Sequence, residues 1–371
     1  MTQPITYLDY AATTPVDSRV LDFMMPYFSE HYGNAASRFH AFGWEAEELV
    51  EKARQGIANK LSCRENDIIF TSGATESINL ALKGIFGDFK GHLITVKTEH
   101  KATLDVAEFL ESHGVSLTYL EVNSNGEVNL DDLESAVTKE TRLVSILYVN
   151  NETGLISPLA QVQEICKSKG VLLHVDASQS LGKVPFPIEA DLVSFSAHKI
   201  YGPKGVGVLV AKGHVNLKAQ IHGGKQQRNR RSGTLNVPGI AGVYKAVDLI
   251  DLSESKRLEN LRNGFERRIV ESLKNVTINA VDVERVCSIS NITFNGLDGE
   301  ELLMRLHKIA VSNGSACNTT STEPSYVLRA MGLREESAYS SIRFSFGRFT
   351  TEKEMAMAAD HVIETVKNLC S

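Results

Sequence analysis

The sequence has few cysteines and no long apolar run, and both features narrow the kind of protein that it encodes. Its 371 residues include five cysteines, an odd number at widely separated positions, namely Cys63, Cys166, Cys287, Cys317 and Cys370. A disulfide framework or a cysteine metal site needs paired or closely spaced cysteines, so we expect free thiols and no metal site. No apolar stretch approaches the length that crosses a bilayer, and no basic and apolar leader opens the chain. We therefore expect a cytoplasmic protein without membrane contact.

The chain also lacks the positive charge that is typical of nucleic-acid-binding proteins. Its net charge is -6 and its pI is near 6.0, so we expect no direct nucleic-acid ligand. One local exception is the basic run at residues 225–231, which favours a phosphate-holding or subunit-facing segment, with a solvated loop as the alternative. With 42% apolar and 23% charged residues, the chain can form a large core and a smaller second domain.

Apolar strand patterns alternate with helical patterns up to about residue 211. This alternation predicts an α/β fold with a mostly parallel seven-stranded sheet wrapped by helices. The predicted strands are at 67–71, 92–97, 116–121, 143–149, 171–175, 192–196 and 207–211. The predicted helices are at 44–61, 76–85, 102–113, 129–136 and 159–169.

The pattern changes after Gly239, where one long helix is predicted to run to about residue 275. Strands within 276–295, a helix at 300–306, a strand near 341–346 and a last helix at 352–369 follow. This second pattern predicts a smaller α+β domain. We expect a large domain over residues 15–255 and a small domain formed by residues 1–14 and 256–371.

One lysine lies at the end of an apolar strand, where it is suited to chemistry. Lys199 follows the strand at 192–196 directly, beside His198 and before a turn rich in glycine and proline. An amine in a partly desolvated pocket loses proton affinity and can form a Schiff base with an aldehyde cofactor, above all pyridoxal phosphate (PLP). The alternative is a solvated surface lysine, so this prediction needs support from the rest of the chain.

The residues at three other strand ends suit the ring nitrogen, the phosphate and the ring face of PLP. Asp176 ends a buried strand and can keep a pyridine nitrogen protonated, unless it only forms a helix cap or Asx turn. Residues 70–81 pass from a strand through small residues into a helix, which suits a phosphate but also an ordinary helix start. His100 follows a third strand and can stack on the ring or move protons, with a purely structural histidine as the alternative.

A second candidate catalytic residue is Cys317, which lies among small and polar residues at 311–328. The segment has no apolar periodicity, so we expect residues 313–324 to form an exposed, mobile loop. An exposed thiol can act as a nucleophile where its surroundings help it to ionise. The other four cysteines lie in helical or strand-like sequence or near a terminus, which favours inert thiols.

These motifs together resemble the cysteine desulfurases of the group that includes bacterial NifS and IscS proteins, within the fold type I PLP enzymes. The resemblance runs from residues 7–15 (Tyr-Leu-Asp-Tyr-Ala-Ala-Thr-Thr-Pro) to residues 341–345 (Ser-Ile-Arg-Phe-Ser). The most specific motifs are residues 196–205 (Ser-Ala-His-Lys-Ile-Tyr-Gly-Pro-Lys-Gly) and 314–317 (Gly-Ser-Ala-Cys). The resemblance implies an aspartate-aminotransferase-like fold, with a large PLP-binding domain and a small domain that carries the catalytic cysteine.

The resemblance also implies a role for each matching residue. Lys199 would carry the cofactor, His100 would stack on its ring and take part in proton transfer, and Arg343 would clamp the substrate carboxylate. Asp176 would pair with the ring nitrogen, Gln179 with the phenolic oxygen, and Asn151 would lie beside ring and substrate. The phosphate would be bound by Ala74, Thr75, Ser196 and His198, and by Thr234 of a neighbouring subunit, so a homodimer is implied.

The implied reaction removes sulfur from L-cysteine and releases L-alanine. Lys199 would move the α-proton, and the Cys317 thiolate would attack the substrate sulfur and keep it as a persulfide for an acceptor protein. The acceptor stays open between an iron-sulfur scaffold and a tRNA or DNA thiolation enzyme, and Cys317 is also a candidate transient iron-sulfur ligand. The alternatives are a selenocysteine lyase, another fold type I PLP enzyme, or a non-catalytic sulfur carrier.

Overall fold

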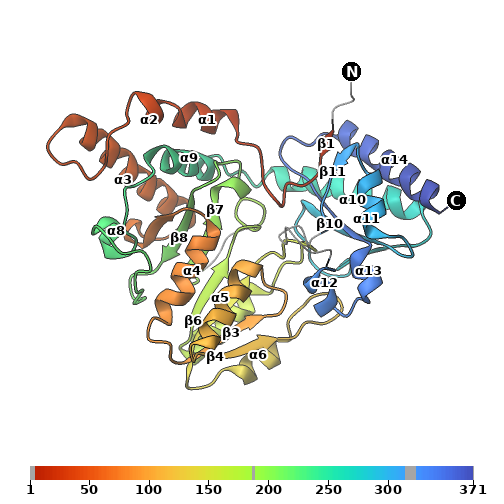
Figure 1. The fold of residues 1–371 in the computed structure, drawn as a ribbon, viewed down its shortest axis with the longest axis horizontal. Coiled ribbons are helices and arrows are strands. Elements are labelled where there is room, and N and C mark those ends of the chain that lie inside the picture. The colour runs from red at the N-terminus through yellow and green to blue at the C-terminus, as the bar shows by residue number, and fades with distance from the viewer. Residues whose placement is uncertain (1–4, 186–188, 314–322, 371) are drawn as a thin grey trace.

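The computed structural model describes residues 5–185, 189–313 and 323–370, which form two bodies joined side by side (Figure 1). Cys317 and most of the expected loop at 313–324 therefore lie outside the described residues. Within the described ranges, no helix combines the length and hydropathy that a membrane span requires.

The larger body is built on a seven-stranded sheet, as predicted. Its strands lie in the order β2-β8-β7-β6-β5-β3-β4, and β8 alone among these seven runs antiparallel to its neighbours. The carboxyl ends of the parallel strands therefore meet at one edge, where ligands bind in open α/β sheets. The strands are β2 (Ile68–Thr71), β3 (His92–Val96), β4 (Ser116–Leu120), β5 (Thr141–Leu147), β6 (Leu172–Asp176), β7 (Leu192–Ser196) and β8 (Gly207–Ala211).

Helices cover both faces of this sheet, because successive strand residues point to opposite sides. In β2, Ile68 and Phe70 pack into the core shared with α3 (Ala41–Leu61) and α9 (Val237–Asp248). Ile69 between them packs with α4 (Ala74–Ile85) and α5 (Lys101–Ser112) on the other face. The remaining helical elements of this body are α1 (Ser18–Met24), α2 (Pro26–Ser29), η1 (Glu65–Asp67), α6 (Leu130–Ala136), α7 (Leu159–Lys169), η2 (Ala197–Lys199) and α8 (Gln226–Asn229).

The single long helix predicted after Gly239 is wrong, because the chain forms two helices there. The helix α9 ends at Asp248, and α10 (Glu254–Ser272) begins after a break. Within the break, the side chain of Asp251 accepts a hydrogen bond from the backbone N–H of Ser253 at 2.9 Å. Such a local bond competes with helical hydrogen bonding in the segment between the two helices.

The smaller body packs α10 and α14 (Glu352–Leu369) against an antiparallel sheet. Its strand order is β12-β10-β9, with β9 (Val276–Ile278), β10 (Ile289–Phe294) and β12 (Ser341–Ser345). The N-terminal segment joins this body, because β1 (Thr6–Tyr7) pairs with β11 (Ile309–Ala310) and Leu8 packs in its core (Figure 1). Three short helices complete it: α11 (Gly299–Arg305), α12 (Tyr326–Ala330) and α13 (Glu335–Tyr339).

Candidate active site

A cavity of about 320 Å³ lies at the carboxyl edge of the seven-stranded sheet, where the two bodies meet. It brings together every cofactor- and substrate-binding residue predicted within the described ranges except Thr234. The predicted residues that line it are Ala74, Thr75, His100, Asn151, Asp176, Gln179, Ser196, His198, Lys199 and Arg343. Residues that sequence reasoning did not select complete the wall, among them Ala11, Ala12, Ser178 and Ser312.

Lys199 enters the cavity from η2, directly after β7. Its Nζ donates hydrogen bonds to the carbonyl oxygens of Ala11 at 2.5 Å and Ala12 at 2.8 Å. The side chain is half-buried, so its amine is neither fully solvated nor sealed from a ligand. The N-terminal segment thus holds the amine at the cavity wall, which excludes the surface-lysine alternative.

Asp176 and His100 lie at two further strand ends. The Oδ1 of Asp176 accepts from the N–H of Ser178 at 2.9 Å, so this residue forms the Asx turn that was the alternative and lines the cavity as well. Nδ1 of His100 accepts from the N–H of Ala102 at 3.1 Å and caps α5. Burial lowers the pKa of His100, although the charge of Asp176 opposes this shift. The imidazole of His100 is therefore neutral and carries its proton on Nε2.

The turn before α4 forms an anion cradle at the opposite wall. Oγ of Ser196 accepts from the N–H of Ala74 at 2.6 Å, and its own hydrogen remains available to a ligand. The chain approaches closely here, since a Cβ at Gly207 would lie 2.6 Å from Cα of Gly73. Ala74 and Thr75, the first two residues of this twelve-residue helix, line the cavity, and a helix N-terminus beside a polar cavity is an arrangement that binds phosphate.

His198 lies beside this cradle and is neutral at physiological pH. Its Nδ1 is 3.1 Å from Oγ1 of Thr13, and its carbonyl oxygen accepts from both the N–H and the hydroxyl of Thr14. Burial lowers the pKa of His198 to about 4, and the charges of Lys199 and Lys204 act in the same direction. A neutral imidazole can donate one hydrogen bond to an anion without a charge of its own.

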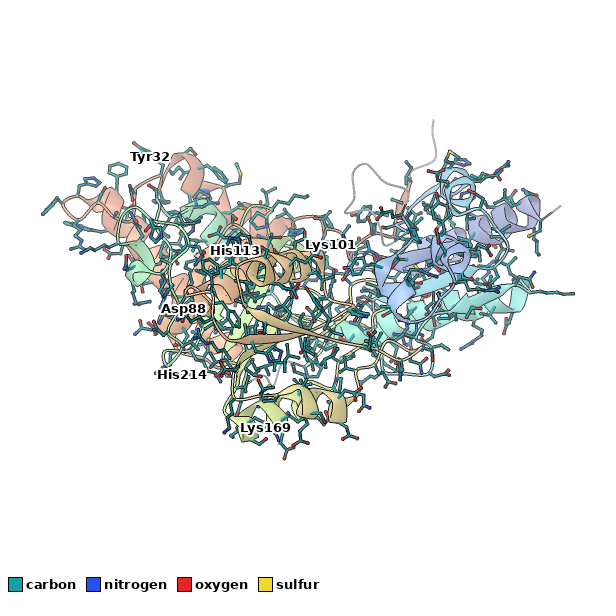
Figure 2. All side chains as sticks on the ribbon, turned by 60° about the horizontal axis from the view of Figure 1, so that its bottom comes forward. Tyr32, Asp88, Lys101, His113, Lys169 and His214 are labelled. Atoms are coloured by element: carbon teal, nitrogen blue, oxygen red, sulfur yellow. The ribbon has the colours of Figure 1, made fainter. Side chains whose placement is uncertain are left out.

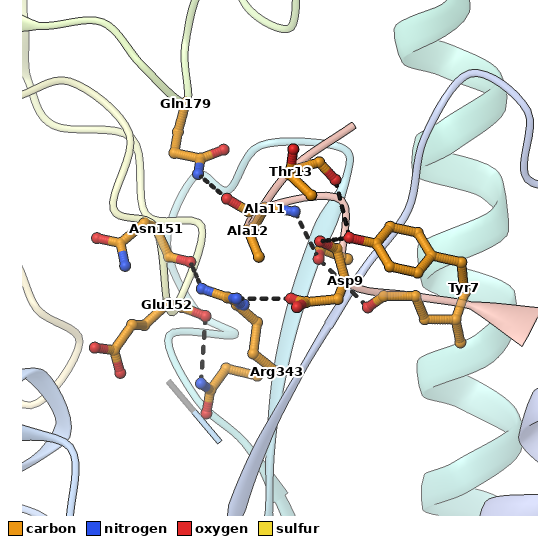
Figure 3. Close-up of polar contacts among 12 residues, drawn as sticks. Tyr7, Asp9, Ala11, Ala12, Thr13, Asn151, Glu152, Gln179 and Arg343 are labelled. Atoms are coloured by element: carbon orange, nitrogen blue, oxygen red, sulfur yellow. Dashed lines mark hydrogen bonds and ion pairs between the residues drawn. The ribbon is translucent and has the colours of Figure 1, made fainter. Parts of the chain in front are cut away.

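Arg343 of β12 forms the corner of the cavity that faces the smaller body (Figure 3). Its Nη2 pairs with Oδ1 of Asp9 at 2.7 Å, and its Nη1 donates to the carbonyl oxygen of Asn151 at 3.0 Å. The backbone N–H of Arg343 donates to the carbonyl oxygen of Ser312 at 2.6 Å. A guanidinium so placed can bind a carboxylate in the cavity. Sequence reasoning missed Asp9, although it lies within the motif at 7–15.

Three buried polar atoms in the cavity wall indicate a polar ligand. Within the described ranges, Oδ1 of Asn151, Oγ of Ser178 and Nε of Arg343 have no hydrogen-bond partner. Buried polar atoms are rarely left unpaired in native proteins. Together with an acid, an amine and an anion cradle, these atoms fit a cofactor that carries a ring nitrogen, an aldehyde and a phosphate.

Two buried glutamates beside the cavity were also missed, because their role depends on tertiary contacts. Oγ of Ser325, at the start of α12, donates to Oε2 of Glu152 at 2.5 Å, and the hydroxyl of Tyr326 donates to the carbonyl oxygen of Glu99 at 2.6 Å. Burial raises the pKa of both carboxyl groups, in Glu99 far above its ordinary range. The described residues on either side of 314–322 are therefore anchored at the cavity, Ser312 by Arg343 and Ser325 by Glu152.

The four described cysteines are free thiols, as expected. Burial raises the pKa of Cys63 to about 11 and of Cys166 to about 12, and it raises the pKa of Cys287 as well. These three thiols remain protonated near neutral pH and are poor nucleophiles. Cys370 is exposed near the end of α14.

Thr234 does not reach the main cavity. It lines a separate pocket of about 440 Å³ with residues of α3 and of the basic run, including Arg54, Lys225 and Arg228. Within one chain, Thr234 therefore cannot contact a ligand that Lys199 holds.

Nearly the whole chain matches a known family. The family model for aminotransferase class V covers residues 6–357. The chain belongs to the aminotransferase class-V family. A relative in Anaeromyxobacter sp. (strain Fw109-5) named cysteine desulfurase IscS is 50% identical over 98% of this chain and 93% of its own. The resemblance to cysteine desulfurases is thereby confirmed, and members of this family are PLP enzymes.

Solved structures agree with this assignment and with the fold type I architecture. A NifS-like protein matches with a TM-score of 0.92 and 38% identity, covering 98% of this chain and all of its own. A structure titled "SspA in complex with cysteine" matches with a TM-score of 0.83 and 35% identity, covering 93% of this chain and all of its own.

Proposed function

We propose that the protein is a cysteine desulfurase, which removes sulfur from L-cysteine, releases L-alanine and carries the sulfur as a persulfide on Cys317. The observation that carries the proposal is the single cavity that presents an amine, Lys199, and a guanidinium, Arg343. An amino-acid substrate needs both, one for its cofactor chemistry and one for its carboxylate. The IscS relatives, about half identical over nearly the full chain, favour cysteine over other amino acids.

PLP is the proposed cofactor, and the cavity wall suits each of its parts. Lys199 would hold PLP until the substrate amine takes its place, and PLP would then supply an electron sink for the substrate's α-carbon. Asp176 would hold its ring nitrogen, Gln179 its phenolic oxygen and His100 one face of its ring. Ala74, Thr75, Ser196 and His198 would hold the phosphate.

The substrate would lie between the cofactor site and Arg343. Arg343 would bind the carboxylate, and Asn151 would orient the amino acid beside the ring. Lys199 would take the α-proton once its amine is free, with His100 assisting proton transfer.

The Cys317 thiolate would then attack the substrate sulfur, so that an S–S bond forms as the substrate C–S bond breaks. The carbon fragment keeps the electron pair of that bond, takes up a proton and is released as alanine. The segment of Cys317 starts beside Arg343, because Ser312 lines the cavity and bonds to this arginine.

We also propose a homodimer, in which Thr234 reaches the phosphate held by the partner subunit. The separate pocket of Thr234 supports this, since the residue has no access to its own subunit's cavity. Exposed apolar side chains that are frequent between residues 21 and 44 support it further, and Tyr32 among them lies far from the smaller body (Figure 2). These side chains are Leu21, Met25, Phe28, Tyr32, Phe39, Phe42 and Trp44. Light scattering on the purified protein should give twice the chain mass of 40.7 kDa.

We propose a large domain over residues 15–255 and a small domain formed by residues 1–14 and 256–371, with the cavity between them. The enzyme would act in the cytoplasm and pass sulfur to an acceptor protein, an iron-sulfur scaffold or a thiolation enzyme.

The deciding experiment compares two cysteine variants of the full-length, PLP-loaded protein. Cys317→Ser should abolish alanine formation from L-cysteine and leave no persulfide in the mass spectrum. Cys370→Ser, which removes the exposed thiol after α14, should keep both. Full alanine formation and persulfide by the Cys317→Ser protein would refute the proposal.

A further inference from the structure

The basic run at residues 225–231 covers an edge of the seven-stranded sheet. It includes α8, on the side of the larger body away from the smaller body (Figure 1). Among the described strands, β2 is the outermost of this sheet and pairs on one side only. The side-chain amide of Gln227 bonds to its backbone: Oε1 accepts from the N–H of Phe70 at 2.7 Å, and Nε2 donates to the carbonyl oxygen of Phe70 at 2.7 Å. This double bond pattern anchors the run to the strand.

The backbone of the run is strained at this anchor. Gln227, Arg228 and Asn229 have φ values of 49°, 59° and 62°, which makes three successive left-handed residues without a glycine. Residues with a side chain rarely adopt this conformation in succession, and such strain persists where the surrounding structure determines it. Gln227 is also buried, so the run is not the solvated loop that was the alternative.

The end of the same run is bonded to the anion cradle. Arg231 contacts Glu76 of α4 twice, from Nε to Oε1 at 2.8 Å and from Nη2 to Oε2 at 3.3 Å. Oε2 of Glu76 also accepts from the N–H of Ser72 at 2.7 Å, which closes the turn before α4. Both partners are mostly shielded from water, since 21% of the Arg231 side chain and 16% of the Glu76 side chain are exposed.

Glu76 is ionised near neutral pH, as this set of donors requires. Burial alone would raise the pKa of Glu76, but the hydrogen bonds from Arg231 and Ser72 outweigh it and lower the pKa. The carboxylate therefore connects a buried cationic side chain to the backbone of the turn. Charge-assisted bonds of this kind are stronger than neutral ones.

The two attachments of the run lie on either side of the cradle. Gln227 holds Phe70 before the turn, and Arg231 holds Glu76 after it. The first two residues of α4, which line the cavity, lie between these points. Residues 225–231 themselves are not part of the cavity wall that the described residues form. The run can therefore act on a ligand in the cavity only through the turn.

We propose that Arg231 is a positioning residue for the phosphate cradle: anchored through Gln227, it fixes the turn before α4 by way of Glu76 and does not touch the anion itself. The identity of that anion rests on the proposed function, in which the cradle holds the phosphate of PLP. A cradle that is already fixed loses less conformational freedom when the anion binds, so it binds the anion more tightly.

Two variants separate positioning from simple charge attraction. Arg231→Met removes a positive charge and weakens anion binding under either explanation. Glu76→Gln removes a negative charge beside the cradle, so charge alone predicts tighter anion binding. An amide replaces one of the two acceptor oxygens by an NH₂ group, which then faces a donor of Arg231 or Ser72. Positioning therefore predicts weaker anion binding in Glu76→Gln.

The measurement compares PLP with pyridoxal, which has the same ring and aldehyde but no phosphate. Each is titrated into the cofactor-free protein. The dissociation constant for PLP should rise about fivefold to twentyfold in both variants, and that for pyridoxal should change by less than about twofold. A general loss of structure would raise both constants together and would overturn the proposal.

The matched control is Arg230→Met, which removes the same charge from the same run. Arg230 donates to the carbonyl oxygens of Asn66 and Ala211, at 3.4 Å each, at the end of β2 away from the cradle. Both dissociation constants should stay as in the wild type. If Arg231→Met does not fold, Arg231→Lys, which keeps the charge but not the two-pronged contact, should also weaken PLP binding. An unchanged or lower PLP constant in Glu76→Gln overturns the proposal, as does an equal rise in Arg230→Met.

Hydrogen–deuterium exchange gives a second readout in the cofactor-free protein, without PLP or cysteine. Amides of residues 70–77 should exchange about threefold to tenfold faster in Arg231→Met and Glu76→Gln, and at the wild-type rate in Arg230→Met. Wild-type exchange in all three variants overturns the proposal. A wild-type protein that binds PLP no more tightly than pyridoxal would instead overturn the proposed cofactor, so the two failures are distinguishable.

Discussion

Two regions of different construction form the wall of the cavity. At the sheet edge, Asp176 and His100 are held by backbone N–H groups only two residues away in the chain. At the corner, Arg343 is held by Asn151 and Asp9, which are 192 and 334 residues away. The edge is assembled locally at the ends of strands, whereas the corner exists only when the two bodies and the N-terminal segment are packed together.

This difference separates the tasks of the two regions. The edge carries the groups proposed for the cofactor. Asp176 and His100 can be positioned as soon as the sheet forms, whereas the Lys199 amine also needs the carbonyl oxygens of Ala11 and Ala12. The corner carries the group proposed for the substrate carboxylate and borders the segment that contains Cys317. Variants at the edge should therefore change cofactor spectra, and variants at the corner should change the use of substrate.

The largest effect is expected from Lys199→Ala at the edge. The variant lacks the amine that would hold the cofactor and move the α-proton, so alanine formation should fall by about a thousandfold or more. The visible absorbance band that is expected of the PLP-loaded wild-type protein should be absent as well. Lys212→Met is the control, because Lys212 donates to the carbonyl oxygen of Glu189, away from the cavity. A Lys199→Ala protein that keeps the absorbance band and the activity would contradict the proposed role of the sheet edge.

The next effect is expected from Arg343→Lys at the corner. Lysine cannot reproduce the two-pronged geometry of a guanidinium, so kcat/KM for L-cysteine should fall about a hundredfold, chiefly through KM. The absorbance band should stay as in the wild type. Asp9→Asn keeps the guanidinium but removes its ion pair, so kcat/KM for L-cysteine is expected to fall by about tenfold. A wild-type KM in Arg343→Lys would contradict the division of tasks.

A pH effect on stability should arise beneath the edge, at His174 in β6. Its ring nitrogens lie 2.8 Å from Oγ of Ser145 and 2.9 Å from Oγ of Ser194, and complete burial lowers the pKa of His174 to about 3. The unfolded chain takes up a proton below about pH 6.5 while the folded chain does not, so stability falls as the pH drops from 6.5 toward 3.

Through His174, the free energy of unfolding should fall by roughly 2–3 kcal/mol between pH 7 and pH 4.5. Urea unfolding of His174→Gln at both pH values should show a smaller loss than the wild type. His31→Gln, a substitution of an exposed histidine, should show the wild-type loss. Equal losses in all three proteins would contradict the expected role of His174.

The smallest effect is expected from Ser178→Ala. The backbone N–H that holds Asp176 remains, and only the unpartnered hydroxyl is removed. The dissociation constant for PLP, measured by titration of the cofactor-free protein, should rise by about threefold to tenfold. A loss as large as that in Lys199→Ala would show that Ser178 does more than donate one hydrogen bond.

Much of the edge was predictable because strand patterns are local. The seven strands were found at nearly their observed positions, and Lys199, Asp176 and His100 were selected because each follows or ends one. The break between α9 and α10 was missed, since one Asx turn at Asp251 interrupts a continuous helical pattern. Asp9, Glu99 and Glu152 were missed because their partners are distant in the chain.

By itself, the sequence determined the order of strands and helices and the residue types at the ends of strands, because side-chain periodicity and turn chemistry act over a few residues. It also carried the motifs that resemble cysteine desulfurases. Only the tertiary structure decided that Arg343 pairs with Asp9 and that Thr234 lies outside its own subunit's cavity. Such contacts depend on how distant segments pack, and no local pattern records that.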